Sequence, residues 1–208
     1  MILETLSLGP MQVNCYILAS RKESEAVLID PGAQPEKIRS VLMRHKLKPA
    51  LIVNTHGHID HIGSDDVFGV PVYIHRQDAT MLKDSRLNLS AFLDSSFCVQ
   101  SKINLLEEKE KIVLGGIILE VIHTPGHTPG GICLLMHKPS NKILFTGDSL
   151  FYRSIGRTDF AQGDTDLLIK SIKEKILKLP DDIVIYPGHG PSSTIGEEKR
   201  NNPFLGPE

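Results

Sequence analysis

The chain has 208 residues, of which 40% are hydrophobic, and it carries a formal net charge of -2. This length and apolar content suffice for a folded core, while nucleic acid or an anionic membrane surface would require a clustered basic excess that the sequence lacks. We therefore expect a small-molecule partner and neither nucleic acid nor membrane; the composition gives no indication of the oligomeric state.

The N-terminus, MILETLSLGP, has no basic segment followed by a continuous apolar run. The chain also contains no stretch of about 18 apolar residues, the minimum for a transmembrane helix. The three cysteines are widely spaced and form no C-x-x-C pair: Cys15, Cys98 and Cys133. An odd, dispersed set of cysteines is typical of free thiols in a reducing compartment. We therefore expect a cytoplasmic protein without a disulfide framework.

Hydrophobic periodicity predicts the elements of the first half in chain order. Three strands (1–8, 14–20 and 25–32) are followed by a helix (35–46), a strand (50–57), a short helix and a strand (71–75). Residues 84–102 are predicted to form a loop. The second half predicts a hairpin (111–127) with Gly115 and Gly116 at its turn, two strands (131–137 and 142–150), a helix (165–179) and a strand (182–190).

The apolar strands LIVN and DIVIY require cover on both faces or a partner sheet. The helix at 165–179 has one apolar stripe and a solvated lysine-rich face. These patterns predict an α/β protein in which two mixed β-sheets pack face to face and are flanked by helices. No low-complexity linker divides the chain, so we expect a single domain over residues 1–208.

Four polar side chains each follow the carboxyl end of an apolar strand: His56, His127, Asp148 and His189. In layered α/β proteins ligands bind at this position, because loops there lie on a rigid sheet yet stay open to solvent. Four such strand ends therefore predict one shared site.

The segment THGHIDHIG concentrates three histidines and an aspartate within six positions. We expect Gly57 to permit a turn that brings His56 and His58 to one side, with Asp60 and His61 one helical turn further on. Helix caps and surface histidines are the alternative interpretation, but the coincidence with the other strand ends favours a metal site.

Five imidazoles and two carboxylates can serve two metal ions if one carboxylate is shared. Such ligands suit zinc, and also iron or manganese. Two divalent ions in this setting lower the pKa of water from 15.7 to about 7 and polarise a carbonyl or phosphoryl oxygen.

The motifs THGHIDHIG, HTPGHT, FTGDSLF and YPGHGP resemble, in order and spacing, those of the metallo-β-lactamase fold hydrolases. The resemblance covers nearly the whole chain and implies an αββα sandwich with a dinuclear centre at one edge. It implies that His56, His58 and His127 hold the first metal, that Asp60, His61 and His189 hold the second, and that Asp148 bridges them. It further implies a metal-bridging hydroxide as the nucleophile, oriented by Asp60 as the catalytic residue.

Within that family, SIGRTDFAQGD and the C-terminal segment after YPGHGP resemble the glyoxalase II branch in its short form. That branch hydrolyses hydroxyacylglutathione thioesters such as S-lactoylglutathione to a hydroxy acid and a thiol. The longer form has a C-terminal helical domain with basic residues for glutathione, whereas 19 residues follow His189 here. The resemblance therefore supports thioester hydrolysis more strongly than glutathione as the thiol. Arg157 is the candidate anchor for a substrate carboxylate, and an ion pair with Asp159 or Asp164 is the equally weighted alternative.

The main rival function is oxidation, because GRTDF also occurs in the iron-dependent persulfide dioxygenases of this fold. Those enzymes would use only His56, His127 and Asp148, and their last loop tends to read PAHDY where this chain reads PGHGP. That loop favours the hydrolase. Lactonases and β-lactamases share the metal motif. A zinc-stabilised interaction module is disfavoured, since a structural zinc needs four ligands only.

Overall fold

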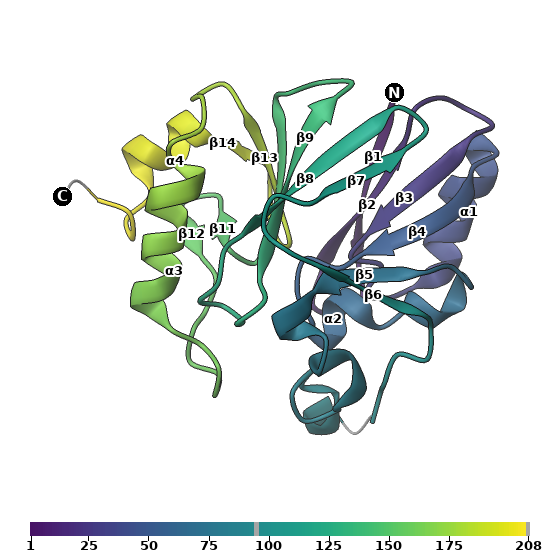
Figure 1. The fold of residues 1–208 in the computed structure, drawn as a ribbon, viewed down its shortest axis with the longest axis horizontal. Helices are drawn as coiled ribbons and strands as arrows, with labels where there is room; N and C mark the ends of the chain where they lie inside the picture. Colours follow the sequence, from purple (N-terminus) through teal and green to yellow (C-terminus); the bar gives the residue numbers. More distant parts are fainter. Residues whose placement is uncertain (94–95, 207–208) are drawn as a thin grey trace.

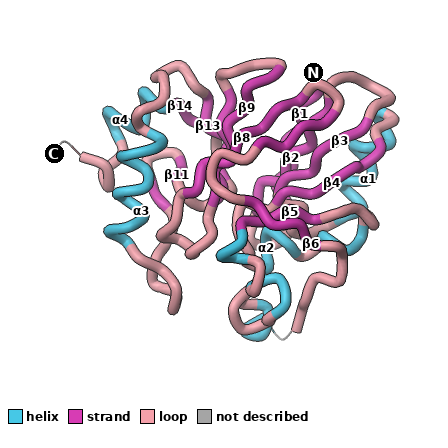
Figure 2. Tube along the Cα trace, viewed as in Figure 1, coloured by secondary structure: helices cyan, strands magenta, loops and turns pink. Residues whose placement is uncertain are grey.

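Within residues 1–93 and 96–206, which the computed structural model describes, two six-stranded sheets face each other and helices cover their outer faces (Figure 1). Figure 2 shows the same layers, with strands at the centre and the longer helices outside. This arrangement confirms the predicted αββα sandwich. None of the described helices is long and apolar enough to cross a membrane.

The first sheet is mixed: its first three strands pair antiparallel, and the third to the sixth pair in parallel. In spatial order its strands are β1 (Ile2–Leu8), β2 (Val13–Ala19), β3 (Glu25–Ile29), β4 (Lys48–Val53), β5 (Val72–His75) and β6 (Ile103–Leu106). Because β4 and β5 are parallel, the loops after them emerge at the same edge of the sheet.

The second sheet is also mixed, because β13 pairs in parallel with β10 while the other neighbours are antiparallel. Its order is β14 (Ser193–Thr194), β13 (Val184–Pro187), β10 (Ile143–Gly147), β9 (Ile132–Lys138), β8 (Ile117–His123) and β7 (Lys111–Leu114). A separate ribbon follows β10 and consists of β11 (Leu150–Phe151) and β12 (Ser154–Ile155).

Helix α1 (Pro35–His45) covers the outer face of the first sheet, and α3 (Thr165–Ser171) and α4 (Ile195–Asn201) cover that of the second (Figure 1). The short α2 (Ile59–Ile62) follows β4. The remaining turns are short and helical: η1 (Asp65–Val67), η2 (Arg76–Asp78), η3 (Met81–Lys83), η4 (Ser90–Leu93) and η5 (Ile172–Ile176).

Strand β2 shows how the layers share the core. All seven of its residues are buried, because successive side chains point to opposite faces and both faces are covered. Cys15 and Ile17 pack into the cluster beneath α1, whereas Tyr16 and Leu18 pack into the cluster between the two sheets. A third cluster lies between the second sheet and α3.

Several predicted elements differ from the structure. The helix predicted over 165–179 is α-helical only to Ser171 and continues as the π-helical turn η5 to Ile176. The segment predicted as a loop over 84–102 contains η4, and β6 follows it as an unpredicted edge strand. The elements β11, β12, β14 and α4 were not predicted either.

Candidate metal centre

The seven predicted metal-binding residues lie together where strand ends of the two sheets meet. The loop and short helix after β4 contribute four of them, and the loops after β8, β10 and β13 contribute one each. The seven residues are His56, His58, Asp60, His61, His127, Asp148 and His189. The structure brings them into one cluster, and their function as metal ligands stays a prediction.

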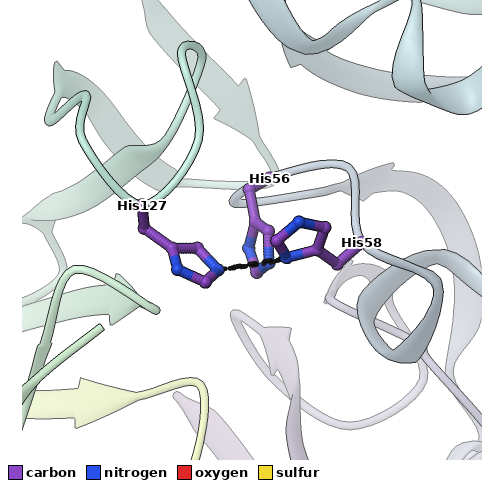
Figure 3. A group of neighbouring side chains, drawn as sticks. All are labelled: His56, His58 and His127. Carbon is purple, nitrogen blue, oxygen red and sulfur yellow. Dashed lines mark hydrogen bonds between the residues drawn. The ribbon is translucent and has the colours of Figure 1, made fainter. Parts of the chain in front are cut away.

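Three imidazoles converge on one point, as Figure 3 shows. The Nδ1 atom of His58 lies 3.0 Å from Nε2 of His56 and 3.1 Å from Nε2 of His127, and the two Nε2 atoms are 3.3 Å apart. Ligand nitrogens about 2.0–2.1 Å from a tetrahedral zinc would lie about 3.3–3.4 Å apart. The spacing therefore fits one metal ion held by three nitrogens.

Burial favours the uncharged forms of His56 and His58. Desolvation, followed by the neighbouring imidazole of His127, lowers the pKa of His58 to about 3. Desolvation and the surrounding histidines also hold the pKa of His56 well below its usual value. Neutral imidazole is the form that binds a metal, so this group suits a divalent cation without prior loss of protons.

A second group consists of Asp60, His61 and His189. The Oδ2 atom of Asp60 lies 3.2 Å from Nε2 of His189 and 3.6 Å from Nε2 of His61. Asp148 lies between the two groups, with Oδ1 3.4 Å from His61 Nε2. Its Oδ2 atom is 3.6 Å from the Nε2 atom of His127 and 3.7 Å from that of His189. This position suits a carboxylate shared by two ions.

Nε2 of His61 and Oδ1 of Asp148 are among the buried polar atoms that lack a hydrogen-bond partner within the described residues. Buried polar atoms in folded proteins are nearly always paired, because an unpaired one costs roughly 1–3 kcal/mol. Both atoms are metal-ligating types and face the cluster. A divalent ion would satisfy them, so the residues present fit the metal that the motifs predict.

In the second group, the charges of neighbouring side chains shift the pKa values more strongly than desolvation does. Burial alone would favour the neutral forms, but Asp60, Asp148 and Asp30 hold the pKa of His61 well above its usual value. Burial alone would raise the pKa of Asp148, but the neighbouring imidazoles, chiefly that of His61, lower it. A metal ion at this position would therefore displace a proton from His61.

Two glycines allow the ligands to approach one another. Gly188, directly before His189, has no room for a side chain, because an added Cβ would lie 2.1 Å from Oδ1 of Asp148. At Gly57 an added Cβ would lie 2.5 Å from Cβ of Met81. The sequence interpretation of Gly57 as the maker of a tight turn needs this correction, since its φ lies outside the left-handed region and close packing is what excludes a side chain.

Residues outside the seven orient them. The Oδ2 atom of Asp30 lies 3.0 Å from Nδ1 of His61, and the same carboxylate accepts hydrogen bonds from the backbone and hydroxyl of Thr55. The carbonyl of Arg157 lies 2.7 Å from Nδ1 of His127, which leaves Nε2 of that ring facing the metal position. The hydrogen bond at Nδ1 fixes the tautomer and direction of the His127 imidazole.

Asp78 was not predicted and is buried beside the centre. Its Oδ2 atom accepts hydrogen bonds from the backbone of Gly57 at 3.2 Å and the hydroxyl of Thr128 at 2.7 Å, and its Oδ1 atom accepts one from the backbone of Gly130 at 2.5 Å. One carboxylate thus links the loop that carries His58 to the loop that carries the third imidazole. No motif marks it, because its partners are distant in sequence.

Side chains of the first sheet form hydrogen bonds with the loop that carries His189. Asn14 donates hydrogen bonds from Nδ2 to the carbonyls of Pro187 and Gly190, and the hydroxyl of Tyr16 donates to that of Pro187 at 2.6 Å. The carbonyl of Met11 lies 3.0 Å from Nδ1 of His189. These contacts place a ligand of the second sheet against β2, and the sequence analysis missed them.

A cavity of about 780 Å³ opens on the metal centre and is lined by five of its residues. Arg157, the predicted anchor for a substrate carboxylate, also lines it. Its Nε and Nη2 atoms donate to the two carboxylate oxygens of Asp159, each at 2.6 Å, and its guanidinium lies 4.4 Å from the ring centre of Phe160. The alternative interpretation, an ion pair with Asp159, is what the structure contains.

Comparisons with known proteins agree with this geometry. Residues 8–189 match the family model described as the metallo-beta-lactamase superfamily. The hydroxyacylglutathione hydrolase GloC of Haemophilus influenzae is 38% identical over 99% of this chain and 98% of its own. The crystal structure of the BLEG-1 B3 metallo-beta-lactamase has a TM-score of 0.90 and 40% identity, covering 98% of this chain and 99% of that one.

A third relative bears on metal content. The crystal structure of TTHA1623 in a di-iron-bound form is 35% identical, with a TM-score of 0.80 over 97% of this chain and 100% of that one. Members of this superfamily bind divalent metals, often two, and this structure gathers groups of histidine and aspartate side chains that could hold them. The chain belongs to the metallo-beta-lactamase superfamily.

Proposed function

We propose that the protein is a metal-dependent thioester hydrolase, of the kind that cleaves S-lactoylglutathione or a related hydroxyacylglutathione to a hydroxy acid and a thiol. The observation that carries this proposal is the gathering of two complete ligand groups around Asp148 at the floor of one cavity. The similarity to GloC, a hydroxyacylglutathione hydrolase, supports the substrate class.

In this proposal His56, His58 and His127 hold one divalent ion, Asp60, His61 and His189 hold a second, and Asp148 contacts both. Zinc fits the nitrogen and oxygen donors best, and iron or manganese accept the same ligands. When bound, two such ions lower the pKa of water and polarise a carbonyl, which are the two requirements of thioester hydrolysis.

Asp60 is the residue best placed to orient the attacking water. It lines the cavity, and its side chain is 15% exposed. Burial opposes its ionisation, but the imidazole of His61 and the contact with His189 outweigh burial and keep its pKa below the usual value. An ionised Asp60 would accept a hydrogen bond from water at neutral pH and direct the oxygen lone pair toward the acyl carbon.

The dioxygenase alternative would need His56, His127 and Asp148 alone. The remaining ligand residues can persist in such enzymes, so the observation that favours the hydrolase is the last loop, which reads PGHGP here. β-Lactam hydrolysis is the other activity to exclude, because a B3 metallo-beta-lactamase is among the similar structures.

The test begins with chelated protein to which zinc, manganese or iron is added back in turn. Loss of thioester absorbance with S-lactoylglutathione, with about two metals bound per chain, would support the proposal. Oxygen uptake on glutathione persulfide without hydrolysis would select the dioxygenase, and cleavage of a chromogenic β-lactam without thioester hydrolysis would select a lactamase.

The ligand assignment is tested by His58→Ala with His137→Ala as control. The imidazole of His137 lies 2.9 Å from Glu120 on the surface, away from the centre. We expect His58→Ala to bind fewer metal ions and to lose more activity than the roughly 10- to 100-fold that removal of a supporting residue causes. Full metal content and full hydrolysis in His58→Ala would contradict the assignment.

A further inference from the structure

The cavity above the metal centre has an apolar wall. Its volume of about 780 Å³ lies within the range of roughly 300–1,000 Å³ that encloses most small-molecule ligands. Besides five residues of the centre and Arg157, every described residue that lines it is apolar. The wall includes Met11, Leu89, Phe92, Leu93, Phe151 and Phe160.

Phe92 and Leu93 are the unusual members of this wall. Their exposed fractions are 75% and 54%, although large apolar side chains normally avoid water. They belong to the turn η4, whose first backbone N–H, that of Ser90, donates to the side chain of the buried Asn88. The backbone of Asn88 in turn accepts a hydrogen bond from Ile59, the first residue of α2. The turn that carries the exposed pair is therefore connected through Asn88 to the helix that carries Asp60 and His61.

The charge of the wall does not suit a glutathione thioester. Glutathione carries two carboxylates, and binding it tightly calls for cationic side chains. Among the described lining residues Arg157 is the one guanidinium and there is no lysine. Its Nε and Nη2 atoms donate to the carboxylate of Asp159, so the ion pair presents little net charge to a ligand.

We infer that this cavity binds an uncharged, apolar group of the thioester, carried on either the acyl or the thiol side, and that a glutathione ester is a poorer substrate than a neutral one. The inference rests on the proposed hydrolysis. The reaction itself is unchanged: water adds across the C–S bond, the acyl carbon takes the hydroxyl group, and the thiol sulfur takes the proton. Burial of apolar area against Phe92, Leu93 and their neighbours supplies the added affinity.

The test measures kcat/KM of the metal-loaded protein along two series. The acyl series joins one neutral thiol, N-acetylcysteamine, to acyl chains from acetyl to octanoyl. The thiol series joins a lactoyl group to glutathione, N-acetylcysteamine or benzyl mercaptan. If the acyl group contacts the wall, we expect kcat/KM to rise about two- to fourfold per methylene along the acyl series. If the thiol contacts it, we expect kcat/KM to rise from glutathione to benzyl mercaptan.

The variant Phe92→Ala should reduce this rise along the series. Met43→Ala is the matched control, because Met43 is 72% exposed on α1 and outside the cavity. A flat response in both series, or a preference for S-lactoylglutathione over the neutral esters, would overturn the inference while thioester hydrolysis stood. Absence of cleavage of every thioester would instead refute the proposed function, and with it the inference.

Discussion

Asp78 joins the two loops that carry the first group of imidazoles, and its replacement by asparagine tests this connection. The buried carboxylate accepts three hydrogen bonds, two from backbone N–H groups and one from the hydroxyl of Thr128. An amide has one oxygen, and its NH₂ group cannot accept. In Asp78→Asn, either Gly57 or Gly130 therefore loses the acceptor of its backbone N–H.

An unpaired buried N–H costs about 1–3 kcal/mol, so we expect the free energy of unfolding to fall by that amount. Because the loops also position His58 and His127, we expect metal affinity to fall about 10- to 100-fold. Urea unfolding of the metal-free protein measures the first effect, and competition with a chromogenic chelator measures the second.

Asp66→Asn is the matched control. Asp66 also accepts from two backbone N–H groups and one hydroxyl, those of Gln100 and Ser101, but it holds a loop away from the metal centre. Because Oδ1 of Asp66 accepts from all three groups, the amide oxygen of asparagine can keep these bonds, and we expect this variant to keep both its stability and its metal affinity. Equal losses of metal affinity in both variants, or unchanged metal affinity in Asp78→Asn, would refute the connection.

Three further predictions concern space, thiols and pH. Gly188→Ala should bind metal at least about tenfold more weakly, by the same chelator competition, because its Cβ would lie 2.1 Å from a carboxylate oxygen of the centre; unchanged affinity would mean that the loop can move. At pH 8 the folded protein should react with a thiol reagent at the half-buried Cys98 alone, because burial raises the pKa of Cys15 well above its usual value and that of Cys133 to about 11, whereas unfolded protein should show three thiols. Desolvation, followed by the stacked imidazole of a second histidine, lowers the pKa of His75 to about 4, below about 6.5 in the unfolded chain. The contribution of neutral His75 to the free energy of unfolding is therefore complete above pH 6.5. It is lost as the pH falls toward 4, by up to about 3 kcal/mol. Urea titrations should show a smaller loss over that window in His75→Gln, and an identical loss in both proteins would contradict the assignment.

The residues of the metal centre were predictable because each stands in a local pattern: histidine or aspartate beside glycine, just after an apolar strand. Such a pattern can be recognised from adjacent positions. The segment THGHIDHIG alone contains four of the seven residues that cluster in the structure. The layers were predictable for a similar reason, since strands such as β2 carry apolar residues on both faces and require cover on both.

Asp30, at the end of a strand before Pro31-Gly32, was also predictable as a contact of a ligand histidine, but Asp78 was not. Asp78 acts through partners 21, 50 and 52 residues away, and no local pattern encodes such pairings. Short edge elements such as β6 form because the neighbouring β5 supplies hydrogen bonds, so four residues of INLL were insufficient as a signal. From the sequence, Arg157 could anchor a substrate carboxylate or form an ion pair. The structure was needed to show the ion pair with Asp159.

Each ligand group draws residues from both sheets: His56 and His58 with His127, and Asp60 and His61 with His189. Neither half of the sandwich holds three ligands of one group alone. An ion bound as proposed would therefore act as a cross-link between segments that are far apart in the chain, and metal occupancy would report docking of the two halves. Removing the metal should increase amide exchange first along the seam where β2 meets the loop of His189, before either sheet opens by itself.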